Sequence, residues 1–172
     1  MIGYMICAAV WRDRKTYRRA SLRDMAEAKV AEAATLVIVD TGPLVAYFNR
    51  RDQYHAWAVK CWSALFDPVV TCEAVISEAG FLLRDDGLEP GKLWHALERG
   101  VVRVDFDFGS QQADLLRLLR KYNDQPISVA DACLVRMAEL KARSTVFTTD
   151  EDFRFYRRHG RGVIPLIAPF AG

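Results

Sequence analysis

The feature that most constrains the fold is an alternation of short, β-branched apolar runs with longer amphipathic segments between residues 36 and 167. The apolar runs lie at 36–40, 68–72, 101–105, 144–150 and 162–167. The segments with helical spacing lie at 42–49, 53–66, 73–85, 88–99, 110–122 and 128–142, followed by a short helical turn at 150–158. Short apolar strands that alternate with helices are typical of a parallel sheet covered on both faces. We therefore expect an α/β fold of three layers, α/β/α, with a central parallel sheet of about five strands.

Residues 1–35 differ from the rest of the chain. They hold seven basic and four acidic residues, and are rich in Arg, Ala and Glu, with only a thin apolar stripe. A helix of this kind is marginal without packing partners. We expect residues 1–35 to be an N-terminal extension, either a loosely packed helix or the product of a start codon assigned upstream of Met25, and residues 36–172 to form the main domain.

Composition excludes several classes of protein. Hydrophobic residues make up 51% and charged residues 27% of the chain, which is typical of a globular domain and not of a disordered one. The apolar runs are far shorter than the roughly 18–20 residues of a membrane span, so we expect no membrane association. The four cysteines form no C-x-x-C pair, and the basic residues of the N-terminus follow its apolar run instead of preceding it. These features favour a cytoplasmic protein.

Acidic residues occur where the predicted strands end. Asp40 closes LVIVD and Asp150 closes VFTTD, while Glu78 and Asp131 lie early in the helices after PVVTC and after residue 127. In an open parallel sheet, ligands bind beyond the carboxyl ends of the strands. We therefore expect these four carboxylates to meet at one edge of the sheet.

Each acid also has a structural explanation when it is taken alone. Ser128 and Asp131 have the spacing of a capping box, Asp150 is a candidate N-cap, and Asp40 before T-G-P is a plausible turn residue. Glu78 is harder to explain in this way, because its helical neighbours place it close to the buried side. The convergence of all four favours a shared function.

Four neighbouring carboxylates require a cation. Two carboxylates 4 Å apart repel each other by about 4 kcal/mol at an effective dielectric constant of 20. Oxygen ligands without nearby His or Cys favour Mg²⁺ or Mn²⁺ over zinc. Such ions lower the pKa of a bound water and bridge phosphate oxygens, which suits phosphodiester hydrolysis.

The ordered set V-D-T-G-P-L-V-A (39–46), V-I-S-E-A (75–79), S-V-A-D-A (128–132) and F-T-T-D-E-D-F (147–153) resembles the PIN-domain ribonucleases, and most of all the VapC toxins of toxin–antitoxin pairs. The resemblance covers about residues 36–167. It implies a Mg²⁺- or Mn²⁺-dependent endoribonuclease that leaves a 5′-phosphate and a 3′-hydroxyl. It further implies a homodimer whose active cleft is occupied by the C-terminal segment of a cognate antitoxin.

The resemblance also implies roles for individual residues. Catalysis is assigned to Asp40, Glu78, Asp131 and Asp150, and the metal ligands are Asp40, Asp131 and Asp150. Asp152 is a candidate outer ligand, and Thr148 and Thr41 are candidate supporting residues. Separately, the basic residues Arg154, Arg157 and Arg158 directly follow the Asp150 turn, where they either contact RNA phosphates or form a solvated surface.

Other readings of the same residues are less favourable. A haloacid dehalogenase-like phosphatase needs a second Asp two residues after the first, and that position is Gly42. Neither G-x-x-x-x-G-K-[ST] nor G-x-G-x-x-G occurs, which argues against P-loop and Rossmann sites. The non-enzymatic alternative is an inactive PIN-like module that binds RNA or serves as a scaffold, from which we expect at least one of the four acids to be missing.

Overall fold

The computed structural model describes residues 35–65 and 68–170. The extension predicted for residues 1–35 therefore lies, apart from Thr35, outside the described residues. The strands of the described part are β1 (Leu36–Val39), β2 (Val69–Thr71), β3 (Val102–Val104), β4 (Ser144–Phe147), β5 (Arg157–Arg158), β6 (Gly162–Val163) and β7 (Leu166–Ile167). The helices are α3 (Thr41–Phe48), α4 (His55–Ser63), α5 (Glu73–Asp85), α6 (Gly91–Glu98), α7 (Phe108–Lys121), α8 (Val129–Leu140) and the 3₁₀ turn η2 (Glu151–Arg154).

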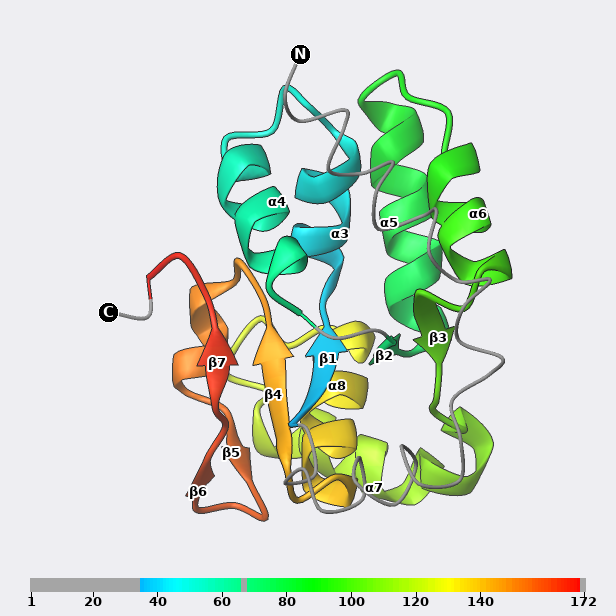
Figure 1. Ribbon diagram of the computed structural model, residues 1–172. Coiled ribbons are helices and arrows are strands. Elements are labelled where there is room, and N and C mark those ends of the chain that lie inside the picture. The colour runs from blue at the N-terminus through cyan, green and yellow to red at the C-terminus, as the bar shows by residue number, and fades with distance from the viewer. Residues whose placement is uncertain (1–34, 66–67, 171–172) are drawn as a thin grey trace, which may run out of the picture. The chain divides into compact units, whose positions relative to one another are not determined.

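A five-stranded parallel sheet forms the centre of the fold, with the strand order β3-β2-β1-β4-β7 (Figure 1). The central strand β1 pairs with β2 through Ile38 and Val70, and with β4 over its whole length. Because all five strands are parallel, their carboxyl ends lie at one edge, as the arrowheads in Figure 1 show. The predicted α/β fold with a central parallel sheet is confirmed.

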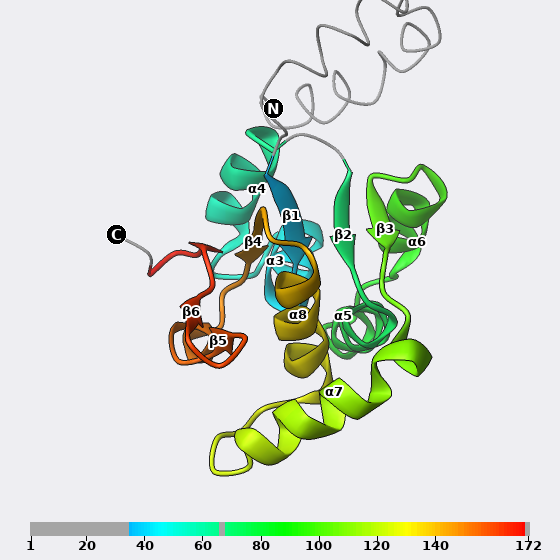
Figure 2. The same ribbon diagram turned by 90° about the horizontal axis from the view of Figure 1, so that it is seen from below.

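Helices cover both faces of this sheet. Helix α8 packs against β1 and β4, and Figure 2 shows α7 and α8 together on one side of the sheet. On the other side, α4 places Trp57 and Trp62 against Phe147 of β4, with ring centroids 5.3 and 5.8 Å apart. Side chains alternate along a strand, so successive residues of β4 can contact both helical layers. Within the described part of the chain, no helix has the length and apolar character needed to cross a bilayer.

The segment 157–167 differs from the prediction. We expected a helical turn up to residue 158 and one continuous strand at 162–167. Instead, β5 and β6 form a short antiparallel hairpin, and only β7 joins the main sheet, where it pairs with β4. Pro165 separates β6 from β7 and has no N–H to donate to a sheet ladder, while its carbonyl oxygen accepts a hydrogen bond from the Val146 N–H (2.9 Å). Before this proline the chain pairs with β5, and after it the chain pairs with β4.

A close approach of two loops shapes the edge where the strands end. A Cβ atom on Gly42, in the first turn of α3, would lie 2.0 Å from Thr149 Oγ1 and 3.3 Å from Thr149 Cβ. Only a residue without a side chain allows the loop after β4 to lie this close to the start of α3. This contact brings the segments that carry Asp40 and Asp150 together.

Candidate active site

Asp40 lies at the centre of the candidate site. It directly follows β1 and is the N-cap of α3, where its Oδ1 accepts a hydrogen bond from the Thr41 N–H (2.7 Å). Its Oδ2 accepts a hydrogen bond from Thr148 Oγ1 (2.7 Å), and only 6% of the residue is exposed. Both oxygens of this buried carboxylate are therefore held by neutral donors.

Two threonines connect Asp40 to Asp150 and Glu78. Thr148, which is fully buried, donates its hydroxyl to Asp40 and accepts the Asp150 N–H (2.9 Å) on the same oxygen. Thr41 donates its backbone N–H to Asp40 and its hydroxyl to Glu78 Oε2 (2.7 Å). Thr41, a candidate supporting residue from the sequence, thus bonds to Asp40 and also to Glu78 on α5.

Glu78 is more exposed than its helical neighbours suggested. The apolar residues Val75 and Ala79 are buried, as expected, but Glu78 itself is an exposed residue of α5. Glu78 thus lies next to the buried side of its helix, as expected, but neighbouring elements do not cover it. Thr41 nevertheless orients its carboxylate towards the start of α3.

Asp131 forms the predicted capping box and also interacts electrostatically with the other acids. Its N–H donates to Ser128 Oγ (3.0 Å), and its Oδ2 accepts the Ser128 N–H (2.8 Å), which completes a capping box at the start of α8. The same carboxylate interacts electrostatically with Asp40, Asp150 and Glu78. A residue that caps the helix thus also belongs to the acid cluster.

Asp150 and Asp152 lie together on the loop after β4. Asp150 is the N-cap of η2, and its Oδ1 accepts the Asp152 N–H (2.9 Å). Burial raises the pKa of Asp152, and the neighbouring charge of Asp150 raises it further. This places Asp152 beside the cluster, next to Asp150.

The electrostatic consequences are clearest at Asp40. The pKa of its carboxyl is raised from 3.8 to about 7. Burial is the largest cause, the hydrogen bonds from Thr148 and Thr41 oppose it, and the charges of Asp131 and Asp150 add to it. Burial also raises the pKa of Asp131, which the bonds from Ser128 lower and the charges of Asp150 and Glu78 raise. The carboxylates thus disfavour one another's ionised forms.

The donor set fits a hard divalent cation. Within the described residues, no Lys or Arg forms an ion pair with any acid of the cluster. Oxygen donors of this kind, without His or Cys among them, suit Mg²⁺ or Mn²⁺. Over 35–65 and 68–170, no three His, Cys, Asp or Glu side chains already surround a single point as a metal site. The carboxylates interact electrostatically, and their side chains would have to turn towards one another to share a cation.

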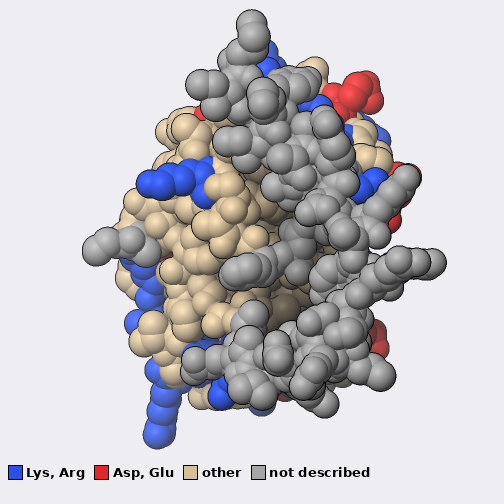
Figure 3. Space-filling model, in the orientation of Figure 1, with Lys and Arg blue, Asp and Glu red and all other residues tan. Residues whose placement is uncertain are grey.

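The arginines after η2 bond mainly to backbone carbonyl groups. The guanidinium of Arg154 donates to Phe170 O (2.6 Å), that of Arg157 to Arg154 O and Tyr156 O (2.6 and 2.8 Å), and that of Arg158 to Ala142 O (3.0 Å). Figure 3 shows Lys and Arg side chains along the edge of the molecule where β5 and β6 lie. Contact with RNA remains a prediction, and it would use the guanidinium N–H groups that these carbonyls leave available.

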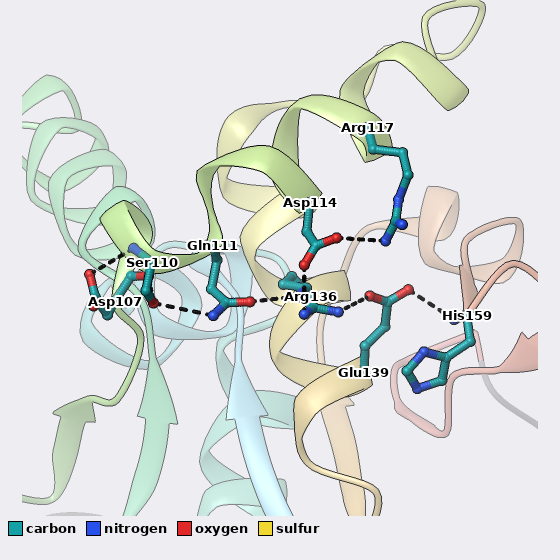
Figure 4. Close-up of polar contacts among 8 residues, drawn as sticks. All are labelled: Asp107, Ser110, Gln111, Asp114, Arg117, Arg136, Glu139 and His159. Carbon is teal, nitrogen blue, oxygen red and sulfur yellow. Dashed lines mark hydrogen bonds and ion pairs between the residues drawn. The ribbon is translucent and has the colours of Figure 1, made fainter.

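A polar network around the buried Glu139 contacts the β5–β6 hairpin (Figure 4). Arg136 of α8 binds Asp114 of α7 (2.7 Å) and Glu139 (2.7 Å), and Glu139 accepts the backbone N–H of His159 (2.8 Å). His159 has a positive φ of 47°, which the turn between β5 and β6 requires. The network connects two helices to the segment that carries the arginines.

Sequence reasoning missed Tyr156. It lies in the run F-R-F-Y, which has the composition of ordinary core, and no motif distinguishes it. In the structure its side chain is fully buried, and its hydroxyl has no hydrogen-bond partner within the described residues.

Comparison with known proteins agrees with this architecture. The family model described as PIN domain matches residues 37–158. Ribonuclease VapC26 of Mycobacterium tuberculosis (strain ATCC 25618 / H37Rv) is 26% identical over 140 residues, covering 76% of this chain and 93% of the relative. The crystal structure of Mycobacterium tuberculosis VapC20, described as a Sarcin-Ricin loop cleaving toxin, is similar with a TM-score of 0.60 and 24% identity, over 67% of this chain and 91% of that chain.

The matched region extends from within β1 to the end of β5, and it contains all four acids of the cluster and the threonines that hold them. The resemblance inferred from the four motifs is therefore confirmed. The chain belongs to the PIN domain family.

Proposed function

We propose that this chain is a metal-dependent endoribonuclease that acts as the toxin of a type II toxin–antitoxin pair. One observation carries the proposal: four carboxylates from four separate segments gather at one sheet edge without a Lys or Arg partner in the described part of the chain. Such an arrangement opposes folding unless a cation is bound there. The nuclease and toxin descriptions of the two VapC relatives support this function for the site.

Asp40, Asp131 and Asp150 would hold the cation. When bound, Mg²⁺ or Mn²⁺ supplies a water of lowered pKa and neutralises charge on a phosphate. Thr148 holds the Asp40 carboxylate and the Asp150 backbone at the same time, so it fixes the distance between these two segments. Glu78 is exposed, and the Thr41 hydroxyl orients its carboxylate. In this orientation it would accept a proton from an attacking water.

The same site defines the partners that we propose. The substrate is RNA, which the name of the ribonuclease relative supports. Without a cation the acid cluster would repel the RNA phosphates, so cleavage would depend on the metal. A cognate antitoxin would inhibit by presenting Arg or Lys to the cluster, which matches its charge and competes with the metal. A homodimer is the assembly implied by the resemblance.

Cleavage of total RNA tests the proposal. The wild-type chain is expected to produce discrete fragments with Mg²⁺ or Mn²⁺ and none with EDTA, and the Asp131→Asn variant to produce none in either condition. The control is Asp124→Asn, which makes the same change at an exposed residue and should retain cleavage. Because Asp131 also caps α8, the thermal unfolding of each variant is measured in parallel.

Two results would contradict the proposal. Equal cleavage by wild type and Asp131→Asn would indicate a contaminating nuclease. Failure of the wild-type chain to bind Mn²⁺ by isothermal titration calorimetry, or equal binding by Asp40→Asn, would show that the acids are not a metal site.

A further inference from the structure

Phe155 is an exposed aromatic residue at the end of η2. The residue is 62% exposed, whereas its neighbours Phe153 and Tyr156 are fully buried. In the described part of the chain, no aromatic ring or cation packs against the Phe155 ring. Single exposed hydrophobic residues are common on protein surfaces, so the surroundings of Phe155 decide what its ring can bind.

The geometry of η2 places Phe155 next to the acids. Its N–H donates to Asp152 O (2.9 Å), and the Asp152 N–H donates to Asp150 Oδ1 (2.9 Å). Side chains three residues apart eclipse one another in a 3₁₀ helix, over a rise of about 6 Å. Phe153 and Tyr156 show this spacing on the buried side, with ring centroids 5.3 Å apart. Phe155 therefore lies on the same side of η2 as Asp152, one turn away from it.

A positive charge lies beside Phe155. The Arg157 guanidinium donates to the carbonyl oxygens of Arg154 (2.6 Å) and Tyr156 (2.8 Å), the residues directly before and after Phe155. Both bonds use Nη1, so Nη2 and Nε have no hydrogen bond within the described residues. The guanidinium is thus held against the backbone of Phe155 while two of its nitrogen atoms remain available to a ligand.

Lys121 brings a second cation to the same surface. Its Nζ donates to the Tyr122 hydroxyl (3.0 Å), which also accepts the Arg157 backbone N–H (3.1 Å). A Cβ atom on Gly160, in the turn of the β5–β6 hairpin, would lie 3.8 Å from this Nζ. Over 35–65 and 68–170, neither Lys121 nor Arg157 forms an ion pair with an acid. The end of α7 and the hairpin therefore add unneutralised positive charge next to Phe155.

An exposed ring among cations suits single-stranded RNA. Bases of a single strand stack on aromatic side chains, and Lys and Arg hold the phosphates between them. An apolar protein surface would suit it less, because it would take the cations out of water without supplying a partner for their charge.

We propose that Phe155 and Arg157 form a binding surface for single-stranded RNA beside the acid cluster, on which Phe155 stacks against a base and Arg157 holds the adjacent phosphate. The inference rests on the proposed function in taking the same RNA as its ligand. It adds the residue that positions the strand relative to the acids.

Fluorescence anisotropy of a short labelled single-stranded RNA tests the stacking contact. Measurement in EDTA at low salt prevents metal-dependent cleavage, and the acid cluster repels the RNA equally in all variants. Phe155→Ala is expected to bind intact RNA about tenfold more weakly than the wild type. It should bind an abasic oligonucleotide of the same length with wild-type affinity, since only stacking is lost. Phe155→Trp should restore the binding of intact RNA, because its larger ring also stacks.

Phe108→Ala is the matched control, because it makes the same change at an exposed phenylalanine at the start of α7. Phe108 follows the edge strand β3, which lies three strand positions from β4, the strand that precedes η2. This variant should bind both oligonucleotides as the wild type does.

Arg157→Gln tests the phosphate contact. It should weaken binding of both the intact and the abasic oligonucleotide. It should also reduce the slope of log affinity against log salt concentration by about 0.7, the contribution of one phosphate of a single strand. Phe155→Ala should leave this slope unchanged. Arg103→Gln, at an exposed position of β3, is the control and should also leave the slope unchanged.

Three results would overturn the inference. They are equal affinity of Phe155→Ala and wild type for intact RNA, equal weakening of intact and abasic RNA by Phe155→Ala, and a wild-type chain that binds no RNA. Unchanged RNA binding with a shift from dimer to monomer in analytical ultracentrifugation would also overturn it, because Phe155 would then be a subunit contact. A wild-type chain that binds RNA through Phe155 but does not cut it with Mg²⁺ or Mn²⁺ would overturn the proposed nuclease and support this surface.

Discussion

Replacement of Asp40 by Asn should stabilise the metal-free protein, and increasingly so as the pH rises. Asp40 is buried, and its charge faces those of Asp131 and Asp150, so the pKa of its carboxyl is raised from 3.8 to about 7. The folded chain therefore binds this proton more tightly than the unfolded chain. The stability that the protonated form contributes is complete below pH 3.8 and is lost as the pH rises through about 7.

The magnitude follows from the size of the shift. A difference of roughly three pKa units corresponds to about 4 kcal/mol of unfolding free energy when Asp40 is ionised in both states. With the same two pKa values, ionisation of Asp40 lowers the unfolding free energy by about 2 kcal/mol at pH 5 and by about 4 kcal/mol at pH 8, relative to the fully protonated protein. Asn carries no charge, so the unfolding free energy of Asp40→Asn relative to the wild type should rise by roughly 2.5 kcal/mol from pH 5 to pH 8. Asparagine also changes the hydrogen bond with Thr148. This change alters the unfolding free energy by the same amount at pH 5 and at pH 8, so it does not affect the difference between the two pH values.

Urea denaturation in EDTA at pH 5 and at pH 8 measures this difference. Asp124→Asn is the matched control, because the same substitution at an exposed turn residue should leave the pH dependence of the wild type unchanged. Addition of Mn²⁺ at pH 8 should restore stability to the wild type and much less to Asp40→Asn. Parallel stability curves for wild type and Asp40→Asn across this range would refute the reasoning, because they would show that folding does not perturb the carboxyl of Asp40.

Two further predictions concern the packing around the site. Gly42→Ala should reduce RNA cleavage, because the new Cβ would lie 2.0 Å from Thr149 Oγ1. The double variant Gly42→Ala/Thr149→Ala should recover part of the activity, since it removes the atom that is too close. A fully active Gly42→Ala variant would contradict this, because it would show that the loop after β4 moves away at no cost. Glu139→Gln should lower the unfolding free energy by about 2 kcal/mol in urea denaturation, because it removes the charge of the buried Glu139 and leaves the partly buried Arg136 with only one of its two ion pairs (Figure 4). The exposed Glu98→Gln should change stability little, and equal effects of the two would contradict a structural role for the network.

Local patterns were sufficient to predict most of the elements and the edge at which the acids meet. Apolar runs identify β1 and β4, and a parallel sheet necessarily places the residues after them, Asp40 and Asp150, at one edge. The break at Pro165 was not predicted, because an apolar run does not specify which strand it pairs with. The exposure of Glu78 was also not predicted, since helical spacing shows which residues share a face but not how far the neighbouring elements extend over it.

The amino-acid sequence by itself determined the fold class, the order of the four acids along the chain and their place at the ends of strands and the starts of helices. These are properties of short stretches, set by side-chain periodicity and by capping preferences. Only the tertiary structure decided that Thr41 holds Glu78, that burial raises the pKa of Asp40, and that the buried Tyr156 hydroxyl has no hydrogen-bond partner among the described residues. Desolvation and long-range hydrogen bonds depend on segments far apart in the chain, such as Asp40 and Thr148, and therefore arise only when those segments pack together.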